Sequence, residues 1–579
     1  IAANVYDKLG QLNSKEVGNE EGRSRLQTVD YNYNIRGWLT GINNTGGSNS
    51  TIGLGTNDLF GFQINYNKPS DLTKALFNGN ISQTLWKSKS ADQTQRSYLY
   101  LYDDLNRLTR AISNDGKFDV GSSIIPITYD KNGNIQKMYR KGAIVASPVY
   151  STTSHFGVMD NMTYTYDSGN KLKAVIDIGN TSYGFKDAST LTTQYTYDTN
   201  GNLTSDANKG ITAITYNHLN LPTEVKFNNS TSQVIKYTYD ATGVKLKKEI
   251  PSKITEYAGN FVYEKIGTGS NVLQFFNHPE GYVSYDGGQF NYVYNYKDHL
   301  GNIRLSYSDE NGNGIIETGS TYTEIIQEKN YYPFGLTHQG YNTGGSPLGN
   351  DAAKRYGFGG KELQSENISG NILDWYDITA RNYDPALGRW MNIDPLAEEF
   401  FEVSPYNYAL NNPVLFLDPD GKKPYPGPFT GTAYRQSNGV ITVARITSNQ
   451  RYAMGVYSQV SYAATGWIGV GVSTYDAYAN SSGNRASDLA NAATPTSTAA
   501  MDKLLDKWGA DAITKSSNKA LGYGSLLGAV VDYGPKHDEQ LQSLTYQFGD
   551  KLIKGSSINI VNEGLFQVND KDATVNGVE

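Results

Sequence analysis

From Val5 to about Asn295, apolar and polar residues alternate in short runs that end at Asn-Gly, Asp-Gly or Gly-Asn pairs. Alternation with a period of two is typical of a β-strand with one buried face. The terminating pairs favour tight turns, because Gly and Asn adopt positive φ at little cost. In one example, Tyr195–Tyr197 is predicted to form the first strand of a hairpin, residues 198–201 its turn and residues 202–204 its second strand. The pattern therefore predicts a long series of β-hairpins.

One phrase recurs in these hairpins: Tyr-Asp or Tyr-Asn, a turn that usually contains Gly, and then Leu or Ile. Successive copies are roughly 19 to 37 residues apart, which is typical of a repeat array with insertions. We expect the Asp after each Tyr to accept backbone hydrogen bonds within its turn, a role that requires no catalysis. The segment from about 41 to 95 departs from the phrase and is interpreted as an insertion across one or two strands. The copies are YDKLGQL, YNIRGWL, YDDLNRL, YDKNGNI, YDSGNKL, YDTNGNL, YNHLNLP and YDATGVKL.

The segment 355–422 has a different composition, rich in turn-forming and aromatic residues. Asp384, Asp394, Asn412 and Asp418 each precede a proline, which disfavours helix at that residue and starts a turn. A short helix is predicted only at residues 395–401. The aromatic and aliphatic residues between the turns predict a tightly folded, loop-rich plug, anchored by Trp375, Tyr376, Tyr383, Trp390, Tyr406, Tyr408, Leu415, Phe416 and Leu417.

The sequence pattern changes again after residue 422. Pro424, Pro426 and Pro428 predict a stiff, extended exit. Strands are predicted near residues 440–446 and 455–462 and in the runs SSINIV and GLFQVN, and one helix is predicted at residues 499–508. This part is therefore predicted to be a separate, small, mixed α/β domain.

Composition supports a chain of many short strands, because 60 Gly and 45 Tyr accompany only 38% hydrophobic residues. The net charge of -7 and the dispersed Lys and Arg residues do not indicate a basic surface for binding nucleic acid. The chain contains no cysteine, which excludes disulfides and thiol chemistry. No apolar run is long enough to span a bilayer. Because the chain begins at Ile1 without a targeting signal, we expect a fragment or processed product whose signal, if any, lies upstream.

Two sequence motifs in the plug region resemble those of a known family. They are YDITARNYDPALGRWMNIDP and then SPYNYALNNPVLFLDPDG, within roughly 65 residues. They resemble the repeat-associated core of the Rhs/YD-repeat family of polymorphic-toxin carriers, which also has Tc-toxin C components and teneurin-type shells among its relatives. The resemblance implies a mainly β fold, in which a spiralling antiparallel sheet forms a hollow cocoon or barrel sealed by the core. It implies a YD-repeat β-shell at residues 1–345, an Rhs core plug at 346–422 and a variable C-terminal effector-like domain at 423–579.

Two carboxylates in the core are candidates for chemistry, because paired acids let one activate water while the other protonates a leaving amine. By resemblance, Asp394 and Asp418 match the aspartates of an intramolecular aspartyl protease that cuts just after a DPxGL word. Arg381 or Arg389 would orient one of them. In this chain the corresponding motif ends in Lys422 instead of Leu. A charged side chain at this position would not fill an apolar pocket. Two interpretations stay open: self-cleavage near Lys422, or a purely structural plug built from Asp-Pro turns.

A calcium loop is the candidate metal site. Asp309, Asn311 and Asn313 supply oxygen at positions one, three and five, and Gly314 stands at position six. Ser320 occupies the twelfth position, where such loops carry a bidentate acid. The alternative is an Asn/Gly-rich β-turn without metal. No other cofactor is expected.

The first functional hypothesis is a secreted or bacterial cell-surface carrier whose shell encloses and delivers a C-terminal toxin domain in interbacterial or host competition. Its expected partners are its own C-terminal domain as cargo, a secretion machinery and a cognate immunity protein. The second hypothesis is a cell-surface structural or adhesive YD-repeat module without toxic activity. Whether the chain is an enzyme depends on self-cleavage and on the C-terminal domain, whose activity and target the sequence does not identify.

Overall fold

The computed structural model describes residues 2–8, 10–19, 24–44, 46, 50–90, 92–180, 182–319, 322–340 and 348–427, together with the backbone of six short strands further on. The chain divides into two compact units, Ile1–Asn34 with Leu39–Gly427, and Ile35–Trp38 with Pro428–Glu579. The first unit contains the hairpin repeats and the core segment.

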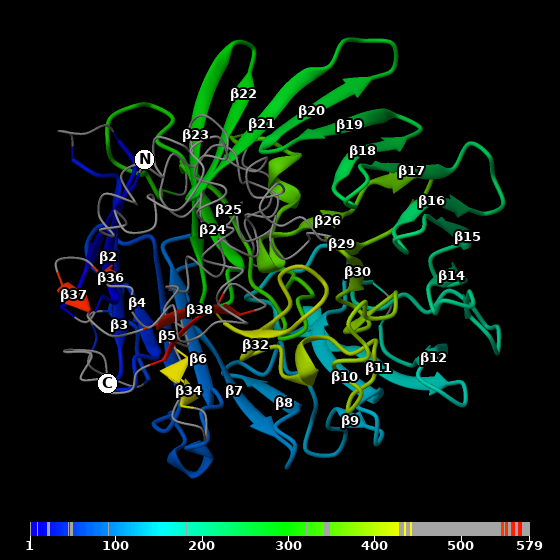
Figure 1. Ribbon diagram of the computed structural model, residues 1–579, viewed down its shortest axis with the longest axis horizontal. Coiled ribbons are helices and arrows are strands. Elements are labelled where there is room, and N and C mark those ends of the chain that lie inside the picture. The colour runs from blue at the N-terminus through cyan, green and yellow to red at the C-terminus, as the bar shows by residue number, and fades with distance from the viewer. Residues whose placement is uncertain are drawn as a thin grey trace, which may run out of the picture. The chain divides into compact units, whose positions relative to one another are not determined.

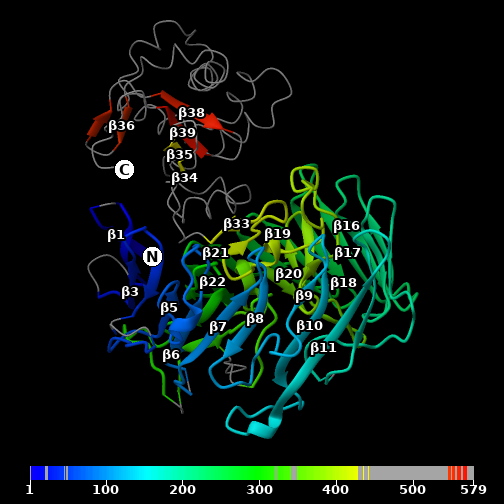
Figure 2. The same cartoon turned by 90° about the horizontal axis from the view of Figure 1, so that it is seen from below.

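Among the residues that the structure describes, the repeats form three antiparallel sheets in which each strand pairs with the next one along the chain. Figure 1 shows their strands following one another around the core segment, and Figure 2 shows the β10–β11 hairpin extending past its neighbours. The prediction of a mainly β, antiparallel fold is confirmed.

The first sheet contains β1 Ala2–Tyr6, β2 Leu12–Val17, β3 Gln27–Tyr33, β4 Leu39–Ile42, β5 Phe60–Asn65, β6 Gln83–Ser88, β7 Arg96–Tyr102 and β8 Leu108–Ser113. The second contains β9 Thr128–Tyr129, β10 Ile135–Ala143, β11 Phe156–Tyr166 and β12 Leu172–Asp177. The third contains β13 Tyr195–Tyr197, β14 Leu203–Asp206, β15 Ile211–Tyr216, β16 Pro222–Phe227, β17 Val234–Tyr239, β18 Lys245–Ile250, β19 Lys253–Ala258, β20 Phe261–Ile266, β21 Val272–His278, β22 Gly281–Asp286, β23 Gln289–Lys297, β24 Ile303–Tyr307 and β25 Ile325–Glu328.

The β13–β14 hairpin illustrates the local geometry of a YD turn. The Asn202 backbone N–H donates to Asp198 Oδ1 at 2.8 Å and the Asn202 side chain donates to Oδ2 at 3.0 Å, while Gly201 has a φ of +83°. The strand register shifts between Thr196 and Tyr197, just before the turn. The predicted structural role of the Asp is confirmed in this turn. The same shift occurs at Tyr6, Tyr33, Tyr102, Tyr166, Tyr216 and Tyr239.

The tyrosine of a repeat also ties its hairpin to the preceding one. The Tyr166 hydroxyl donates to the carbonyl oxygen of Ile135 at 2.7 Å, and Ile135 is the apolar residue that follows the turn of the preceding repeat. Phenylalanine has no hydroxyl to donate, so the polar tip explains why the repeat carries tyrosine. Equivalent bonds run from Tyr33 to Leu12, Tyr102 to Ile81, Tyr129 to Leu108 and Tyr216 to Leu203.

The segment 41–95, interpreted as an insertion, contains strands β5 and β6 of the first sheet. It also contains the 3-10 helix η1, Leu72–Lys74, which begins at Asp71, where the carboxylate accepts the Thr73 N–H at 3.0 Å. Much of this segment, although it lacks the repeated phrase, is therefore regular β-sheet.

The core segment consists of short strands and 3-10 turns. Strands β26, β29, β30 and β31 form one sheet, and the pairs β27–β28 and β32–β33 stand apart from it. Its elements are η3 Ala353–Arg355, η4 Phe358–Gly360, β26 Glu362–Gln364, β27 Asn367–Ile368, β28 Asn371–Ile372, β29 Trp375–Ile378, β30 Arg381–Asp384, β31 Arg389–Trp390, η5 Ala409–Asn411, β32 Phe416–Leu417 and β33 Tyr425–Pro426. The first unit extends to Gly427 because β33 still pairs with β32.

The predicted helix at residues 395–401 is wrong. The chain there forms successive turns, in which Ala397 and Phe400 donate to carbonyl oxygens three residues earlier. A helix this short needs tertiary packing of an apolar face, and Phe401 is 81% exposed. The segment therefore stays in turns.

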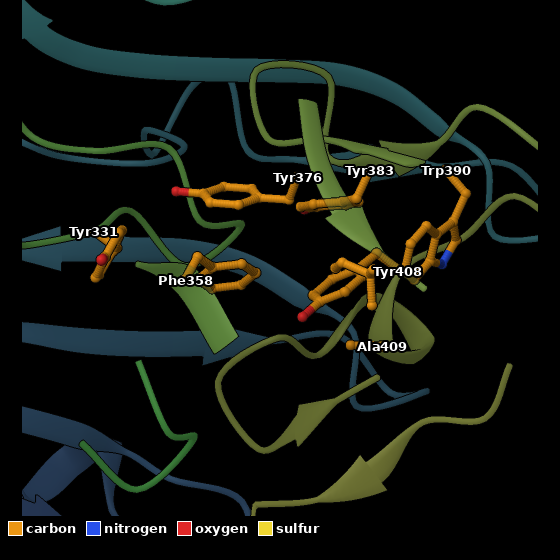
Figure 3. Packing of buried hydrophobic residues seen from close by; sticks show 8 residues of the cluster. Tyr331, Phe358, Tyr376, Tyr383, Trp390, Tyr408 and Ala409 are labelled. Carbon is orange, nitrogen blue, oxygen red and sulfur yellow. The ribbon is translucent and has the colours of Figure 1, made fainter. Parts of the chain in front are cut away.

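A cluster of aromatic rings fills the middle of the core segment (Figure 3). The ring of Tyr383 lies 4.2 Å from that of Tyr408 and 5.4 Å from that of Trp390, measured between centroids. The Tyr383 hydroxyl donates to the Phe334 carbonyl at 2.7 Å. The remaining members are Tyr331, Phe358, Tyr376, Ile378 and Ala409. Such close packing makes the core a rigid base for the side chains at its edge.

Beyond Gly427 the structure describes β34 Tyr434–Arg435, β35 Ile441–Thr442, β36 Tyr546–Phe548, β37 Lys551–Ile553, β38 Ser557–Val561 and β39 Leu565–Asn569. Strands β38 and β39 coincide with the predicted runs SSINIV and GLFQVN and pair with each other. The predicted helix at residues 499–508 lies outside the described residues. Among those that are described, no helix is long and apolar enough to cross a membrane.

Candidate functional site

The core segment contacts turns of the repeat region at several points along the sequence. Asn412 Nδ2 donates to Asn80 Oδ1 at 3.0 Å, and Asn411 Nδ2 donates to the Gly133 carbonyl at 2.7 Å. Turns that are far apart in the sequence thereby contact the same core segment. Further bonds join Ser404 to Asn132, Arg389 to Asn170, Asn392 to Asn202, Tyr406 to Gly201 and Gly359 to Asn302.

Arg381 lies at the centre of the candidate site and contacts both predicted carboxylates. Its Nη2 is 2.9 Å from Asp394 Oδ2 and 2.9 Å from Asp418 Oδ2. The side chains of Arg381 and Asp418 are each 1% exposed, and that of Asp394 is 10% exposed. The guanidinium carbon also lies 4.1 Å from the Trp390 ring centroid, which fixes the plane of the fork. The three residues predicted for catalysis are therefore brought together by the fold.

The three side chains come from different elements. Arg381 begins β30, Asp394 follows β31, and Asp418 follows β32 directly. The backbone N–H of Leu396 donates to Asp394 Oδ1 at 2.8 Å. Arg381 Nη1 donates to the Pro405 carbonyl at 3.2 Å. These bonds leave little freedom for the carboxylates to rotate away from the guanidinium.

The Asp418 carboxylate also organises the turn that follows it. Its Oδ1 accepts the backbone N–H of Gly421 at 2.9 Å and that of Lys422 at 3.0 Å. The carbonyl oxygen of Gly421 accepts Arg381 Nε at 2.6 Å. The Lys422 side chain is exposed to solvent. The chain at the predicted cleavage region is thus held against the acids by its backbone.

Burial changes the proton affinity of both acids. It raises the pKa of Asp418 to about 6, although the Arg381 cation opposes the rise, and the carboxylates of Asp420 and Asp394 add to it. Burial likewise raises the pKa of Asp394 above its ordinary value, again against the effect of Arg381. Burial lowers the pKa of Arg381 itself. Two acids with raised pKa values beside one backbone turn can supply an acid and a base near neutral pH.

Arg389, the other arginine predicted to orient the acids, lies elsewhere. Its Nη2 donates to the Asn170 carbonyl at 3.1 Å, and its guanidinium stacks on the rings of Tyr166 and Tyr406. It ties the core to a YD turn. Gly421 was not among the predicted site residues, and its Asp-Gly pair, a general turn signal, could have marked it.

No family model matches the chain. The tRNA3(Ser)-specific nuclease WapA of Bacillus spizizenii is 25% identical over 330 residues, covering 55% of this chain and 12% of the nuclease. Salivary gland surface protein 1 of Aedes aegypti is 25% identical over 245 residues, covering 39% of this chain and 6% of that protein. The chain therefore spans only a small part of the length of these relatives.

The repeated turns, the core words and these sequence matches agree with the resemblance. The chain is similar to Rhs/YD-repeat proteins. The chain also aligns with the Tc holotoxin pore of Photorhabdus luminescens at 17% identity and a TM-score of 0.44, covering 73% of this chain and 20% of that one. A TcdB2–TccC3 crystal structure aligns at 16% identity and a TM-score of 0.43, covering 72% of this chain and 21% of that one.

Gly421 offers a test of the turn geometry. Its φ is +77°, and a Cβ there would lie 2.6 Å from the Ile378 carbonyl oxygen and 3.0 Å from the Arg381 backbone nitrogen. Gly421→Ala is therefore expected to lower the free energy of unfolding by about 2–4 kcal/mol, because left-handed strain and overpacking add. Urea unfolding measures the loss.

Gly259→Ala is the matched control for Gly421→Ala. Gly259 has a φ of +62°, and no atom of the residues that the structure describes lies within 4 Å of the added carbon. Only the backbone strain remains, so this change should cost about 1–2 kcal/mol. Equal losses for the two variants would contradict the close approach at Gly421.

The candidate calcium loop is folded as a series of Asx turns. Asn311 Oδ1 accepts the Asn313 N–H at 2.9 Å, Asn313 Oδ1 accepts the Ile315 N–H at 2.8 Å, and Asp309 Oδ2 accepts the Gly314 N–H at 2.9 Å. In the part of the chain that the structure describes, no group of three or more His, Cys, Asp or Glu is placed to hold a metal ion. The Asn/Gly turn accounts for these bonds, and calcium binding stays a prediction.

Proposed function

We propose that this protein is a toxin carrier of the Rhs/YD-repeat kind, in which a hollow shell of YD repeats encloses and delivers the C-terminal part of the chain. The carboxylate pair at the end of the core segment carries the proposal, because it lies where the chain passes from the repeats to the C-terminal part. The similarity to tRNA nucleases named WapA supports a toxic C-terminal activity. Secretion or display on a bacterial surface, and a cognate immunity protein, belong to the same proposal.

The core in this proposal is an intramolecular aspartyl protease. Asp394 acts as the base that takes a proton from water, and Asp418 acts as the acid that protonates the leaving nitrogen. The raised pKa of Asp418, about 6, supports this division of roles. Since the Lys422 side chain is exposed, no apolar pocket has to accept it. The departure from Leu at this position is therefore compatible with cleavage.

Self-cleavage is expected to yield two bands when the purified full chain is run on a denaturing gel. Asp394→Asn should give a single band, because the water then lacks its base. The control is Asp351→Asn, which changes an Asp whose side chain is 95% exposed and lies outside the site. Single bands from the folded parent chain and from Asp394→Asn alike would remove the protease from the proposal.

The cleavage rate is expected to fall as pH rises through about 6. Asp418 must carry a proton to act as the acid, and it loses that proton over this range. At lower pH, protonation of Asp394 should slow the reaction again, giving a bell-shaped profile. Band intensities after incubation at a series of pH values measure the rate, and a rate that increases between pH 6 and 8 would contradict the assignment.

Expression of residues 423–579 alone inside bacteria tests the toxic activity. Growth arrest is expected, while expression of residues 1–422 should leave growth unchanged. Healthy growth with a well-folded product would favour the alternative, a surface structural or adhesive module, to which the similarity with a salivary gland surface protein also points.

A further inference from the structure

The Asn-Gly pairs of this chain are candidate sites for a covalent change of the chain itself. In such a pair the glycine backbone nitrogen can attack the side-chain amide carbon of the asparagine, because no Cβ on the glycine hinders its approach. The result is a cyclic succinimide, which water opens to aspartate or isoaspartate. The pairs in the part of the chain that the structure describes are Asn78-Gly79, Asn132-Gly133, Asn200-Gly201, Asn311-Gly312 and Asn313-Gly314.

Most of these pairs are protected by the turns that contain them, because the glycine N–H is already hydrogen bonded. The nitrogen must lose its proton before it can attack, and a bonded N–H keeps both its proton and the orientation of its peptide plane. Gly314 donates in this way to Asp309 Oδ2 at 2.9 Å. The other such bonds lie in YD turns and run from Gly133 to the Asp130 carbonyl at 3.1 Å and from Gly201 to the Asp198 carbonyl at 3.2 Å.

Gly312 differs from these glycines. Among the described residues none accepts a hydrogen bond from the Gly312 N–H, and the residue is exposed. The side chain of Asn311 is folded back along the chain, because its Oδ1 accepts the Asn313 N–H at 2.9 Å. The ring that this bond closes contains both the amide carbon of Asn311 and the Gly312 nitrogen, and the bond polarises the side-chain carbonyl. We propose that Asn311 is a site of spontaneous deamidation in the folded protein.

Asn78-Gly79 meets the same conditions. Asn78 Oδ1 accepts the Asn80 N–H at 3.2 Å, and no described residue accepts a hydrogen bond from the Gly79 N–H. Asn78 should therefore also react in the folded chain, while Asn132 and Asn200, which lie within YD turns, should keep their amides. Deamidation of Asn132 or Asn200 as fast as that of Asn78 would contradict the protection by the YD turn.

The chemical steps balance with water as the only co-reactant. The Gly312 nitrogen bonds to the amide carbon of Asn311, the bond from that carbon to Nδ2 breaks, and the proton of the Gly312 nitrogen leaves with Nδ2 as ammonia. Water then adds to a carbonyl carbon of the succinimide, and the ring opens. Hydrolysis at the former side-chain carbonyl gives aspartate, and hydrolysis at the backbone carbonyl gives isoaspartate. No group is oxidised or reduced.

The product changes the charge of the loop that joins β24 and β25. Asn311 Nδ2 donates to Glu317 Oε2 at 3.2 Å, and deamidation puts a carboxylate in place of this donor. The buried Glu324 carboxylate already accepts the N–H groups of Glu310 and Asn311 in the same loop. Like charges then face each other, so deamidation is expected to loosen the loop.

Peptide mapping by mass spectrometry, after incubation of the full chain in mildly alkaline ¹⁸O-labelled water, tests the proposal. Asn313 is the internal control, since it is exposed in the same loop and also donates to Glu317, yet the N–H of the next residue, Gly314, is bonded. Asn311 should react at least about tenfold faster than Asn313, because a hydrogen bond to a charged acceptor must first break at Gly314. In urea the two rates should be similar. A folded chain in which Asn313 reacts as fast as Asn311, or in which Asn311 reacts only in urea, would overturn the proposal.

Asp309→Ala tests the protection directly. It removes the acceptor of the Gly314 N–H, so the deamidation rate of Asn313 should rise toward that of Asn311. Glu310→Ala is the control, because it removes an exposed neighbouring carboxylate and leaves this bond in place, and it should keep both rates within about twofold. An unchanged Asn313 rate in a folded Asp309→Ala variant would overturn the protection. If that variant does not fold, the ratio of the Asn311 and Asn313 rates in the parent chain decides.

Discussion

Replacing Arg381 by alanine is expected to lower the free energy of unfolding by about 3–5 kcal/mol at pH 7.5, because it leaves a buried carboxylate without its cation. Asp418 is 1% exposed and Arg381 is the cation 2.9 Å from it. The same substitution removes donors to the Gly421 and Pro405 carbonyls and the contact with the Trp390 ring. Urea unfolding followed by tryptophan fluorescence measures the loss.

The loss from Arg381→Ala should shrink as the pH falls. Asp418 already has a folded-state pKa of about 6, above its ordinary value. The folded protein therefore binds this proton more tightly than the unfolded chain, and ionising Asp418 costs stability as pH rises. Without Arg381 the pKa of Asp418 rises further, so at pH 5 the protonated acid needs no cation and much of the loss is recovered.

Arg389→Ala is the matched control for Arg381→Ala. Arg389 is buried in the same core and donates to the Asn170 carbonyl, with its guanidinium over aromatic rings. The two variants lose similar volume, but only Arg381→Ala leaves carboxylates unpaired. We expect about 1–3 kcal/mol for Arg389→Ala, with little pH dependence. Equal losses with equal pH dependence would show that packing, and not charge, decides the effect at Arg381.

The hairpins are predictable from the sequence because their causes are local. The carboxylate of Asp198 and the positive φ of Gly201 act within one turn, and the alternation of residues gives the strands on either side. The bond from the Tyr166 hydroxyl to Ile135 is different. It depends on which hairpins are neighbours in the sheet, and no local pattern contains that information.

The site is predictable only in part. The resemblance places Asp394, Asp418 and Arg381 in one group, but the contact of a single Nη2 with both acids depends on three strand ends meeting. The predicted helix at residues 395–401 fails for a related reason. Its sequence is compatible with helix, yet the Leu396 N–H is bonded to the Asp394 carboxylate and Phe401 faces solvent, so no packed face stabilises a helix.

A second buried ion pair, between Arg140 and Asp160, links the repeats to the core. The two residues are directly opposite on β10 and β11, with Nε 2.7 Å from Oδ2 and exposures of 1% and 0%. Arg140 also donates to the carbonyls of Pro385 and Ala386 in the core, at 3.3 and 2.6 Å. Arg140→Met alone is expected to cost about 3–5 kcal/mol, because Asp160 then stays buried and charged without a partner.

The double variant Arg140→Met/Asp160→Asn should recover a large part of that loss. Asparagine keeps an oxygen for the Phe185 N–H, which donates to Asp160 Oδ1 at 2.7 Å, but it carries no charge that needs a partner. A double-mutant cycle should therefore give a coupling energy of about 2–3 kcal/mol. Urea unfolding of the four chains supplies the values.

The neighbouring pair Lys141 and Asp119 is the control for this cycle. Its atoms are 3.4 Å apart, and the Lys141 side chain is 37% exposed. Solvent screens such a pair, so its own cycle should give a coupling energy below about 1 kcal/mol. Since Lys141 follows Arg140 on the same strand, the two cycles differ mainly in burial. Equal coupling energies would contradict the argument that burial makes Arg140 indispensable to the junction between repeats and core.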